Sequence, residues 1–497
     1  MTRKVSLFVF AGLLAAGLPV AGLPVAGAQE LPPTPPRNQW YAANDFGYWS
    51  DGSRVRVDEA CLGIEDEQER VACSLEAFRA RPFVVIALTD TGINPYHQEF
   101  RAPEFTHHPS TYIEGYPAAP TALNVSLDVA DAQGYDAAVG ADASLWNGVG
   151  GNKLYWFPGT RIIGGYSSIV DGAERILDDN GHGTGTSSVS SGRWYGSNPN
   201  ALIVMVEGLG DTPLNWAMSQ PWIDIVTNSW GPSLGGLSTG SATASRDATR
   251  RGQSVLFSAG NGMRNTNSSE AWGAVEDATG VGDPCDCKLP NSNLTFTSHN
   301  KGPSWIMAVG AASPVNGQSH WWHGIPPDVS SFGSKWRAAS ATGVLHEHNR
   351  DFGGTSNASP TTAGVLSAII ERARVALGDT VAGQKAGAVV AQAATGVTPP
   401  ASGPLADGKL TRAEAEDLVL KTAMPVPFDP VKATWDYAIY PTTPLYFTYQ
   451  GYGIVDKTSK ALALSVLMGE AAMPVRTEVD AWMAQLDAAR NAVYGQP

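Results

Sequence analysis

Three residues whose side chains could together perform nucleophilic catalysis lie on glycine-marked turns of this chain. Asp90 ends an apolar run, His182 lies in Asn-Gly-His-Gly-Thr, and Ser356 lies in Gly-Gly-Thr-Ser-Asn-Ala-Ser-Pro. A serine hydroxyl is a weak nucleophile until a histidine accepts its proton, and a carboxylate orients that histidine and stabilises its positive charge. Each segment alone has an ordinary explanation as a capped helix or a turn. Together they predict a hydrolytic centre.

A fourth group would complete that centre. Asn261 follows another apolar run and has a glycine on each side. An amide N–H aimed at a developing oxyanion stabilises the transition state of acyl transfer. The backbone N–H of Ser356, at the start of a predicted helix, would be the second donor.

The elements that must position these residues alternate between strands and helices. Apolar runs predict buried strands at residues 83–88, 161–165, 201–206, 223–227, 254–259, 305–311 and 329–333, and helices are expected at 214–219, 241–251 and after Ser356. This order predicts an α/β fold with a mostly parallel sheet, whose strand ends carry Asp90 and Asn261. The hydroxyl-rich segment 186–191 has poor helix propensity and is predicted to be a loop.

The domain organisation follows from composition. Residues 1–28 have two basic residues, an apolar run and Ala-Gly-Ala before Gln29, the pattern of an export signal, so a secreted or periplasmic protein is expected. Residues 29–80 are predicted to form an N-terminal arm, and residues 81–465 one domain with insertions near 95–159 and 379–410. The second insertion is rich in Ala, Gly and Pro and is predicted to be flexible. Residues 466–497 are predicted to form a tail helix, amphipathic over 476–494.

Charge and cysteine content restrict the partners. The 497-residue chain has a net charge of -14, which argues against nucleic acid or an anionic membrane surface, and a monomer is expected. Export permits disulfides, and Cys61 with Cys73 is the predicted local pair. For Cys285 and Cys287 a bridge, a free dithiol and a metal site stay open, although no histidine lies at zinc-finger spacing.

Four motifs, in order, carry a family resemblance. Residues 87–93, 180–184, 258–261 and 354–360 resemble the Asp, His, oxyanion-Asn and Ser motifs of the subtilisin-like serine peptidases (subtilases). The resemblance covers about residues 82–377 and 410–464. It implies a three-layer subtilisin-like fold and a secreted serine endopeptidase that cleaves polypeptides through an acyl-enzyme intermediate.

The resemblance also implies a substrate groove. The backbone at Ser229, Trp230 and Gly231 would line the pocket for the residue before the cut, opposite Ala259 and Gly260. No cofactor is required. Calcium is frequent in the family, but the sequence has no D-x-[DN]-x-[DN]-G loop, so no metal ligand is assigned.

The chain departs from the family pattern at several positions. The interval of 92 residues between Asp90 and His182 is longer than in compact members, Gly185 replaces a frequent second histidine, and Asn357 replaces the usual methionine beside the nucleophile. Trp230 is bulkier than the common leucine and would narrow the groove, which favours a processing peptidase of narrow specificity. The segment before the domain is shorter than a usual inhibitory propeptide.

Other functions compete with this interpretation. A non-catalytic binding protein could keep the fold, and an esterase or amidase could use the same triad. Asp178 and Asp179 could form a paired-carboxylate site, but support for His182 is the preferred interpretation. His346-Glu347-His348 could contact a metal, but a solvated loop is preferred.

Overall fold

The computed structural model describes residues 61, 63–80, 82–103, 105–168, 176–230, 238–260, 286–288, 295–297, 303–315, 318–322, 327–333, 336–345, 347–380, 386–425 and 450–497. Asn261, Gly231, Cys285, His346 and the predicted export signal lie outside these residues.

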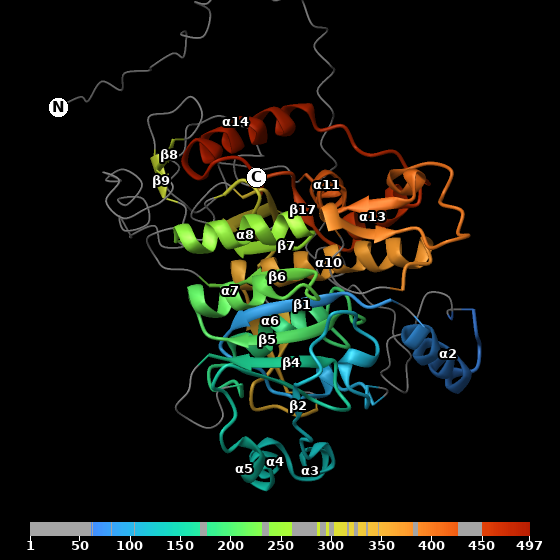
Figure 1. Cartoon of the computed structure of the whole chain (residues 1–497), viewed down its shortest axis with the longest axis vertical. Helices are drawn as coiled ribbons and strands as arrows, with labels where there is room; N and C mark the ends of the chain where they lie inside the picture. The colour runs from blue at the N-terminus through green and yellow to red at the C-terminus, as the bar shows by residue number, and fades with distance from the viewer. Residues whose placement is uncertain are drawn as a thin grey trace, which may run out of the picture.

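An 11-stranded sheet forms the centre of the molecule (Figure 1). Its strand order is β17-β12-β10-β7-β6-β1-β5-β4-β3-β2, with β11 (Gln318–Trp322) paired to β10. The strands from β17 to β4 are mutually parallel, and only β3 and β11 run antiparallel to their neighbours β4 and β10. The bounds of the parallel strands are β1 Val85–Asp90, β4 Ile162–Ser167, β5 Leu202–Glu207, β6 Ile225–Asn228, β7 Ser254–Ser258, β10 Met307–Val315, β12 Val329–Phe332 and β17 Ile454–Val455.

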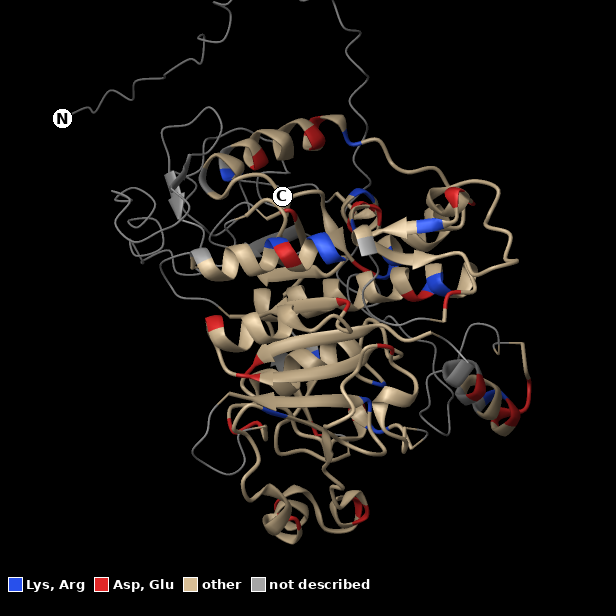
Figure 2. Cartoon of the chain, in the orientation of Figure 1, with Lys and Arg blue, Asp and Glu red and all other residues tan. Residues whose placement is uncertain are grey.

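Helices cover both faces of this sheet, which gives the predicted three-layer α/β fold. Successive side chains of β1 alternate between two hydrophobic cores. Ile86 and Leu88 pack on the side of α6 (His182–Ser191) and α10 (Thr355–Ala376). Val85 and Ala87 pack on the side of α7 (Asp211–Ser219) and α8 (Thr239–Arg251). Because both faces are buried, the strands read as continuous apolar runs, and Figure 2 shows them almost without charged residues.

The prediction of a loop at residues 186–191 is wrong, because these residues belong to α6. The hydroxyls of Ser188 and Ser190 donate to carbonyls three residues earlier, at 2.9 and 3.0 Å, which satisfies these polar groups inside the buried helix. The buried hydroxyl of Ser187 has no partner among the described residues. The small side chains of α6 also let α10 approach closely. A Cβ at Gly364 of α10 would lie 2.5 Å from Ser190 O. Tertiary packing therefore overrides the weak helix propensity.

The long segment between β1 and β4 is folded. It contains the short strand β2 (Thr121–Ala122), the helices α3 (Leu127–Gln133), α4 (Tyr135–Ala141) and α5 (Ala143–Trp146), and β3 (Lys153–Trp156), which pairs with β4. In Figure 1 these three helices lie at the end of the molecule beyond β2. Buried Trp146 donates to the hydroxyl of Tyr96, and that hydroxyl donates to Asp142 at 2.6 Å. The insertion is thus anchored to the loop that follows Asp90.

Residues 386–411 differ from the predicted flexible insertion. Here β15 (Val389–Gln392) and β16 (Lys409–Thr411) form an antiparallel pair. Val390 and Leu405 are buried, so apolar packing orders this Ala- and Gly-rich segment. The helix α11 (Arg412–Thr422) then starts with the predicted capping box of Thr411 and Glu414.

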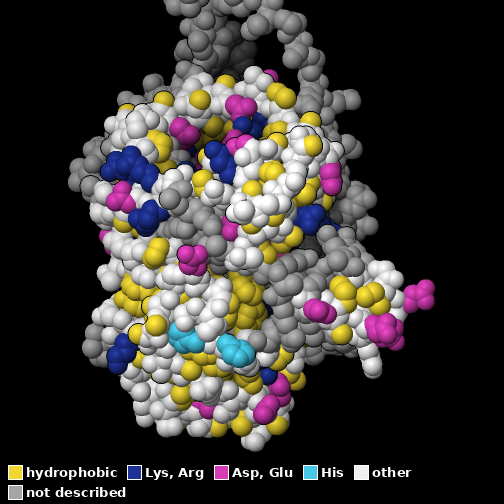
Figure 3. Space-filling model, turned by 45° about the vertical axis from the view of Figure 1, so that its right-hand side comes forward, with side chains coloured by type: hydrophobic (Ala, Val, Ile, Leu, Met, Phe, Trp, Pro, Cys, Tyr) yellow, Lys and Arg dark blue, Asp and Glu magenta, His cyan; other side chains and the backbone are white. Residues whose placement is uncertain are grey.

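The two ends of the described chain carry helices. The helix α2 (Glu67–Ala80) projects beside the sheet and is linked to Cys61 through the predicted Cys61–Cys73 disulfide, with Cα atoms 6.0 Å apart. The predicted tail helix is α14 (Thr477–Tyr494), which follows α13 (Lys457–Leu467). No helix among the described residues is long and apolar enough to span a membrane. On the face drawn in Figure 3, basic and acidic side chains are interspersed.

Candidate active site

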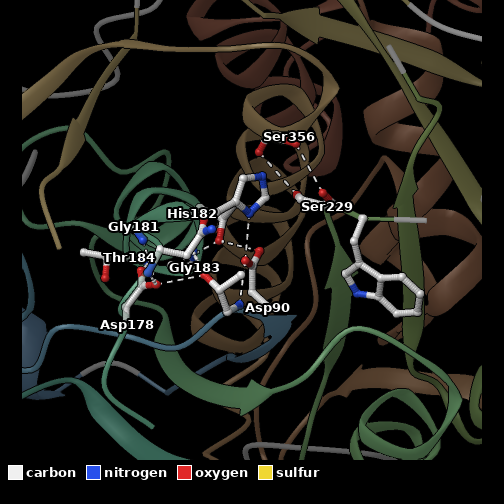
Figure 4. Close-up of polar contacts among 12 residues, drawn as sticks. Asp90, Asp178, Gly181, His182, Gly183, Thr184, Ser229 and Ser356 are labelled. Atoms are coloured by element: carbon white, nitrogen blue, oxygen red, sulfur yellow. Dashed lines mark hydrogen bonds and ion pairs between the residues drawn. The ribbon is translucent and has the colours of Figure 1, made fainter. Parts of the chain in front are cut away.

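Asp90 and His182 meet at the carboxyl edge of the sheet. Asp90 is the last residue of β1, and His182 is the first residue of α6. The carboxylate Oδ1 of Asp90 lies 2.7 Å from the imidazole Nδ1 of His182 (Figure 4). Asp90 is 1 % exposed, whereas the side chain of His182 is 29 % exposed. A buried acceptor therefore fixes one ring nitrogen and leaves the other side of the ring partly open to solvent.

Two further donors hold the Asp90 carboxylate. The backbone N–H of Thr91 donates to Oδ1 at 2.8 Å. The hydroxyl of Thr186 lies 3.1 Å from Oδ2 and 3.0 Å from Gly183 O, so its one proton is shared between these two acceptors. Thr186 lies one turn along α6 from His182, so the helix that carries the imidazole also orients its carboxylate partner. The sequence argument missed this residue, because the loop expected at 186–191 gave its hydroxyl no defined direction.

Asp178 caps the start of α6. Its Oδ1 accepts from the N–H groups of Asn180 and Gly181 at 3.1 and 2.8 Å and from the hydroxyl of Thr91 at 2.8 Å. Its Oδ2 accepts from the N–H of Thr184 at 2.7 Å. Asp178 is 2 % exposed. It therefore satisfies N–H groups at the beginning of the helix and ties the segment before His182 to the end of β1.

The electrostatics of this cluster favour a charged imidazole. Burial of His182 disfavours its protonated form, but the charge of Asp90, the hydrogen bond to Asp90 and the charge of Asp178 outweigh burial and raise the pKa of His182 above its ordinary value. A carboxylate beside Nδ1 directs a neutral ring to expose Nε2 as an acceptor. The arrangement can thus accept a proton at Nε2 and stabilise the resulting imidazolium.

Ser356 lies in the first turn of α10, close to His182. Its hydroxyl donates to the backbone carbonyl of Ser229 at 3.2 Å, and the hydroxyl of Ser229 donates to the carbonyl of Ser356 at 3.2 Å. Figure 4 shows the imidazole between the labelled Asp90 and Ser356. Asp90 and His182 are therefore in contact, and the hydroxyl of Ser356 is directed at Ser229 O.

The predicted substrate-binding residues that the structure describes lie directly after β6 and β7. Ser229 and Trp230 follow β6, and Ala259 and Gly260 follow the neighbouring strand β7. The indole N–H of Trp230 donates to the hydroxyl of Thr89 at 2.6 Å, and its ring contacts Phe257 edge-on. The indole is therefore fixed against the sheet beside Asp90.

The packing around residue 185 explains why this chain has glycine there in place of the histidine that is frequent in the family. A Cβ at this position would lie 2.6 Å from the ring of Phe352, and that ring also packs against the imidazole of His182 with centroids 5.7 Å apart. Phe352, at the end of β14 (His348–Phe352), thus fills the space that a side chain at 185 would need.

The prediction that residues 346–348 form a solvated loop is wrong for His348. Its Nε2 lies 3.0 Å from Oε1 of buried Glu99.

Comparison with known proteins decides the family. The sequence model of the subtilase family matches residues 83–398. The chain belongs to the subtilase family. This subtilase is accordingly a serine peptidase with a subtilisin-like fold. A comparison with curated proteins gives no match.

Solved structures similar to this subtilase include two of the epidermin leader peptide processing serine protease of Staphylococcus aureus. The first, of a mutant, is 14 % identical with a TM-score of 0.40 and covers 79 % of this subtilase and 78 % of that protein. The second, of the unmutated protein, has the same identity and TM-score and covers 80 % and 79 %.

Proposed function

We propose that this subtilase is an exported serine endopeptidase that uses Ser356 as nucleophile, His182 as general base and acid, and Asp90 as the group that orients His182. The observation that carries the proposal is the 2.7 Å contact of Asp90 with His182 beside the N-terminus of the helix that holds Ser356. Each residue has the chemistry that its role requires.

The reaction starts with a rotation of the serine hydroxyl. In the free protein this hydroxyl donates to Ser229 O, and it must turn to Nε2 of His182 when substrate binds. Ser356 Oγ then attacks the peptide carbonyl carbon while its proton passes to His182. The imidazolium protonates the departing amine as the C–N bond breaks, which leaves an acyl-enzyme. A water molecule, deprotonated by His182, hydrolyses the ester and restores the serine.

Two donors stabilise the tetrahedral intermediates in this proposal. One is the backbone N–H of Ser356, in the first turn of α10, where helix N–H groups lack an intrahelical acceptor. The other is the amide of Asn261, which comes immediately after the described end of the segment following β7. Loss of such a side-chain donor lowers kcat by about 100- to 1000-fold in related chemistry.

The substrate is proposed to be a polypeptide chain in extended form. The segments after β6 and β7 supply backbone groups on either side of it, through Ser229, Trp230 and Gly231 and through Ala259 and Gly260. Because the Trp230 indole is fixed by Thr89 and Phe257, it restricts the groove, which supports a processing peptidase of narrow specificity. No cofactor enters the mechanism, and the protein is proposed to act as a monomer after removal of residues 1–28.

Cleavage of a peptide library by the purified protein tests this function. We expect cleavage at a small set of related sequences, hydrolysis of unfolded casein, and no activity in Ser356→Ala or His182→Ala. Rates on matched peptide and ester substrates separate a peptidase from an esterase. Hydrolysis of the ester alone, or casein hydrolysis that survives Ser356→Ala, would overturn the proposal.

A further inference from the structure

The residue that follows the proposed nucleophile carries an unusual buried amide. Asn357 is 0 % exposed in the first turn of α10. Its Nδ2 donates to the carbonyl of Phe332, the last residue of β12, at 2.6 Å. No donor among the described residues reaches its Oδ1. A buried acceptor without a protein partner lowers stability, which an apolar residue of similar size would avoid.

The amide connects β12 with the turn that carries Ser356. The backbone N–H of Gly354 donates to the carbonyl of Gly333 at 2.5 Å. One connection thus lies before the nucleophile and one after it. A side chain at Gly333 would disrupt this contact, because its Cβ would lie 2.5 Å from the Cβ of Ala311 and 2.9 Å from Gly354 O.

Ser356 itself is connected to a different strand. Its two hydrogen bonds with Ser229 join it to the end of β6. The sheet places β7 and β10 between β6 and β12. The nucleophile is therefore connected to two separate strand ends, and the side-chain amide of Asn357 makes a connection to the second of them.

We infer that Asn357 is a positioning residue, whose amide holds the turn bearing Ser356 against the end of β12 at the expense of stability. The inference rests on the proposed function, since it needs Ser356 to be the nucleophile. Asn357 contacts Phe332 and not the substrate path past Ser229, so it acts on the attack step and leaves substrate binding unchanged.

Asn357→Leu tests the inference, because leucine has a similar size but neither the donor nor the unpartnered acceptor. We expect kcat to fall about tenfold, the rate equivalent of one lost hydrogen bond, with KM unchanged. The rate at which a small fluorophosphonate labels Ser356 should fall by the same factor. The Tm should stay equal or rise. Asn357→Asp, which keeps the shape, has no donor for Phe332 O when its carboxyl is ionised, and it should show the same loss of labelling rate at pH values where that carboxyl is ionised.

Thr362→Val is the matched control. Thr362 is buried on the same helix and its hydroxyl donates to Ala358 O within that helix at 3.0 Å, so kcat should not change. All rates are expressed per titrated active site. If the unmodified protein is not labelled, the proposed function fails. If it is labelled and either Asn357 variant reacts as fast per site, or if Asn357→Leu lowers the Tm with kcat unchanged, the positioning role is refuted.

Discussion

Replacing Asp178 by asparagine tests two effects of its carboxylate. One is the hydrogen bonding that stabilises the start of α6, and the other is the charge that raises the pKa of His182. An asparagine Oδ1 can still accept from Thr91, Asn180 and Gly181, which all donate to Oδ1 of Asp178. The Oδ2 contact with the N–H of Thr184, at 2.7 Å, would become a contact between two donors. Loss of one hydrogen bond to a buried charged group costs about 1.5–3 kcal/mol. In a domain of this size that corresponds to a fall in Tm of roughly 2–4 °C.

The same substitution removes a charge that raises the pKa of His182. Because His182 must be neutral to accept a proton, activity rises with pH through the pKa of this group. The acid limb of kcat/KM, which reports the free enzyme, should therefore move to lower pH in Asp178→Asn.

Thermal unfolding and the pH profile of peptide hydrolysis measure the two effects. Asp179→Asn is the control, because Asp179 is the exposed neighbour and its loss should change neither quantity. An Asp178→Asn protein with an unchanged Tm, or with its acid limb unmoved or shifted to higher pH, would refute the reasoning.

Three other predictions concern the packing and charges around the site. Gly185→Ala should lower stability by about 1–3 kcal/mol in thermal unfolding, because its Cβ would collide with Phe352; an unchanged Tm would contradict this packing. Burial raises the pKa of Asp456 from 3.8 to about 6, so the native state is stabilised at low pH and loses that stabilisation as pH rises through about 6. Asp456→Asn keeps the helix cap and should therefore be more stable than the unmodified protein at pH 8, by at most about 3 kcal/mol in denaturant titrations. The difference should vanish below about pH 4, and equal stability at pH 8 would contradict the raised pKa of Asp456. Arg374→Met should cost about 3–5 kcal/mol in the same assay, because it leaves Asp224 buried without its ion pair at 2.6 Å, and adding Asp224→Asn should recover part of the loss.

Much of the fold follows from local sequence patterns. The strands predicted from apolar runs are buried on both faces in the structure. Their sequences are therefore continuously apolar and can be recognised as buried strands without reference to the rest of the fold. The turn after Asp90 and the helix start at Ser356 are marked by adjacent glycines and by a proline that fits only the first turn. These signals sufficed to predict the parallel sheet and the edge at which Asp90 contacts His182.

Features that depend on tertiary packing were not predictable. The helix α6 forms because α10 buries its small residues, and the resulting direction of Thr186 toward Asp90 exists only after that packing. Residues 386–411 are ordered by burial of Val390 and Leu405, although their composition favours flexibility. The direction of the Ser356 hydroxyl depends on Ser229, 127 residues away in the chain.

The most direct test of the account is the site of covalent labelling. Purified protein is treated with a fluorophosphonate at several pH values and digested, and the adduct is located by mass spectrometry. The account predicts one adduct, on Ser356, formed at a rate that rises with pH through the raised pKa of His182 and that is abolished in His182→Ala. An adduct on another residue, or labelling of Ser356 that does not depend on His182, would contradict it.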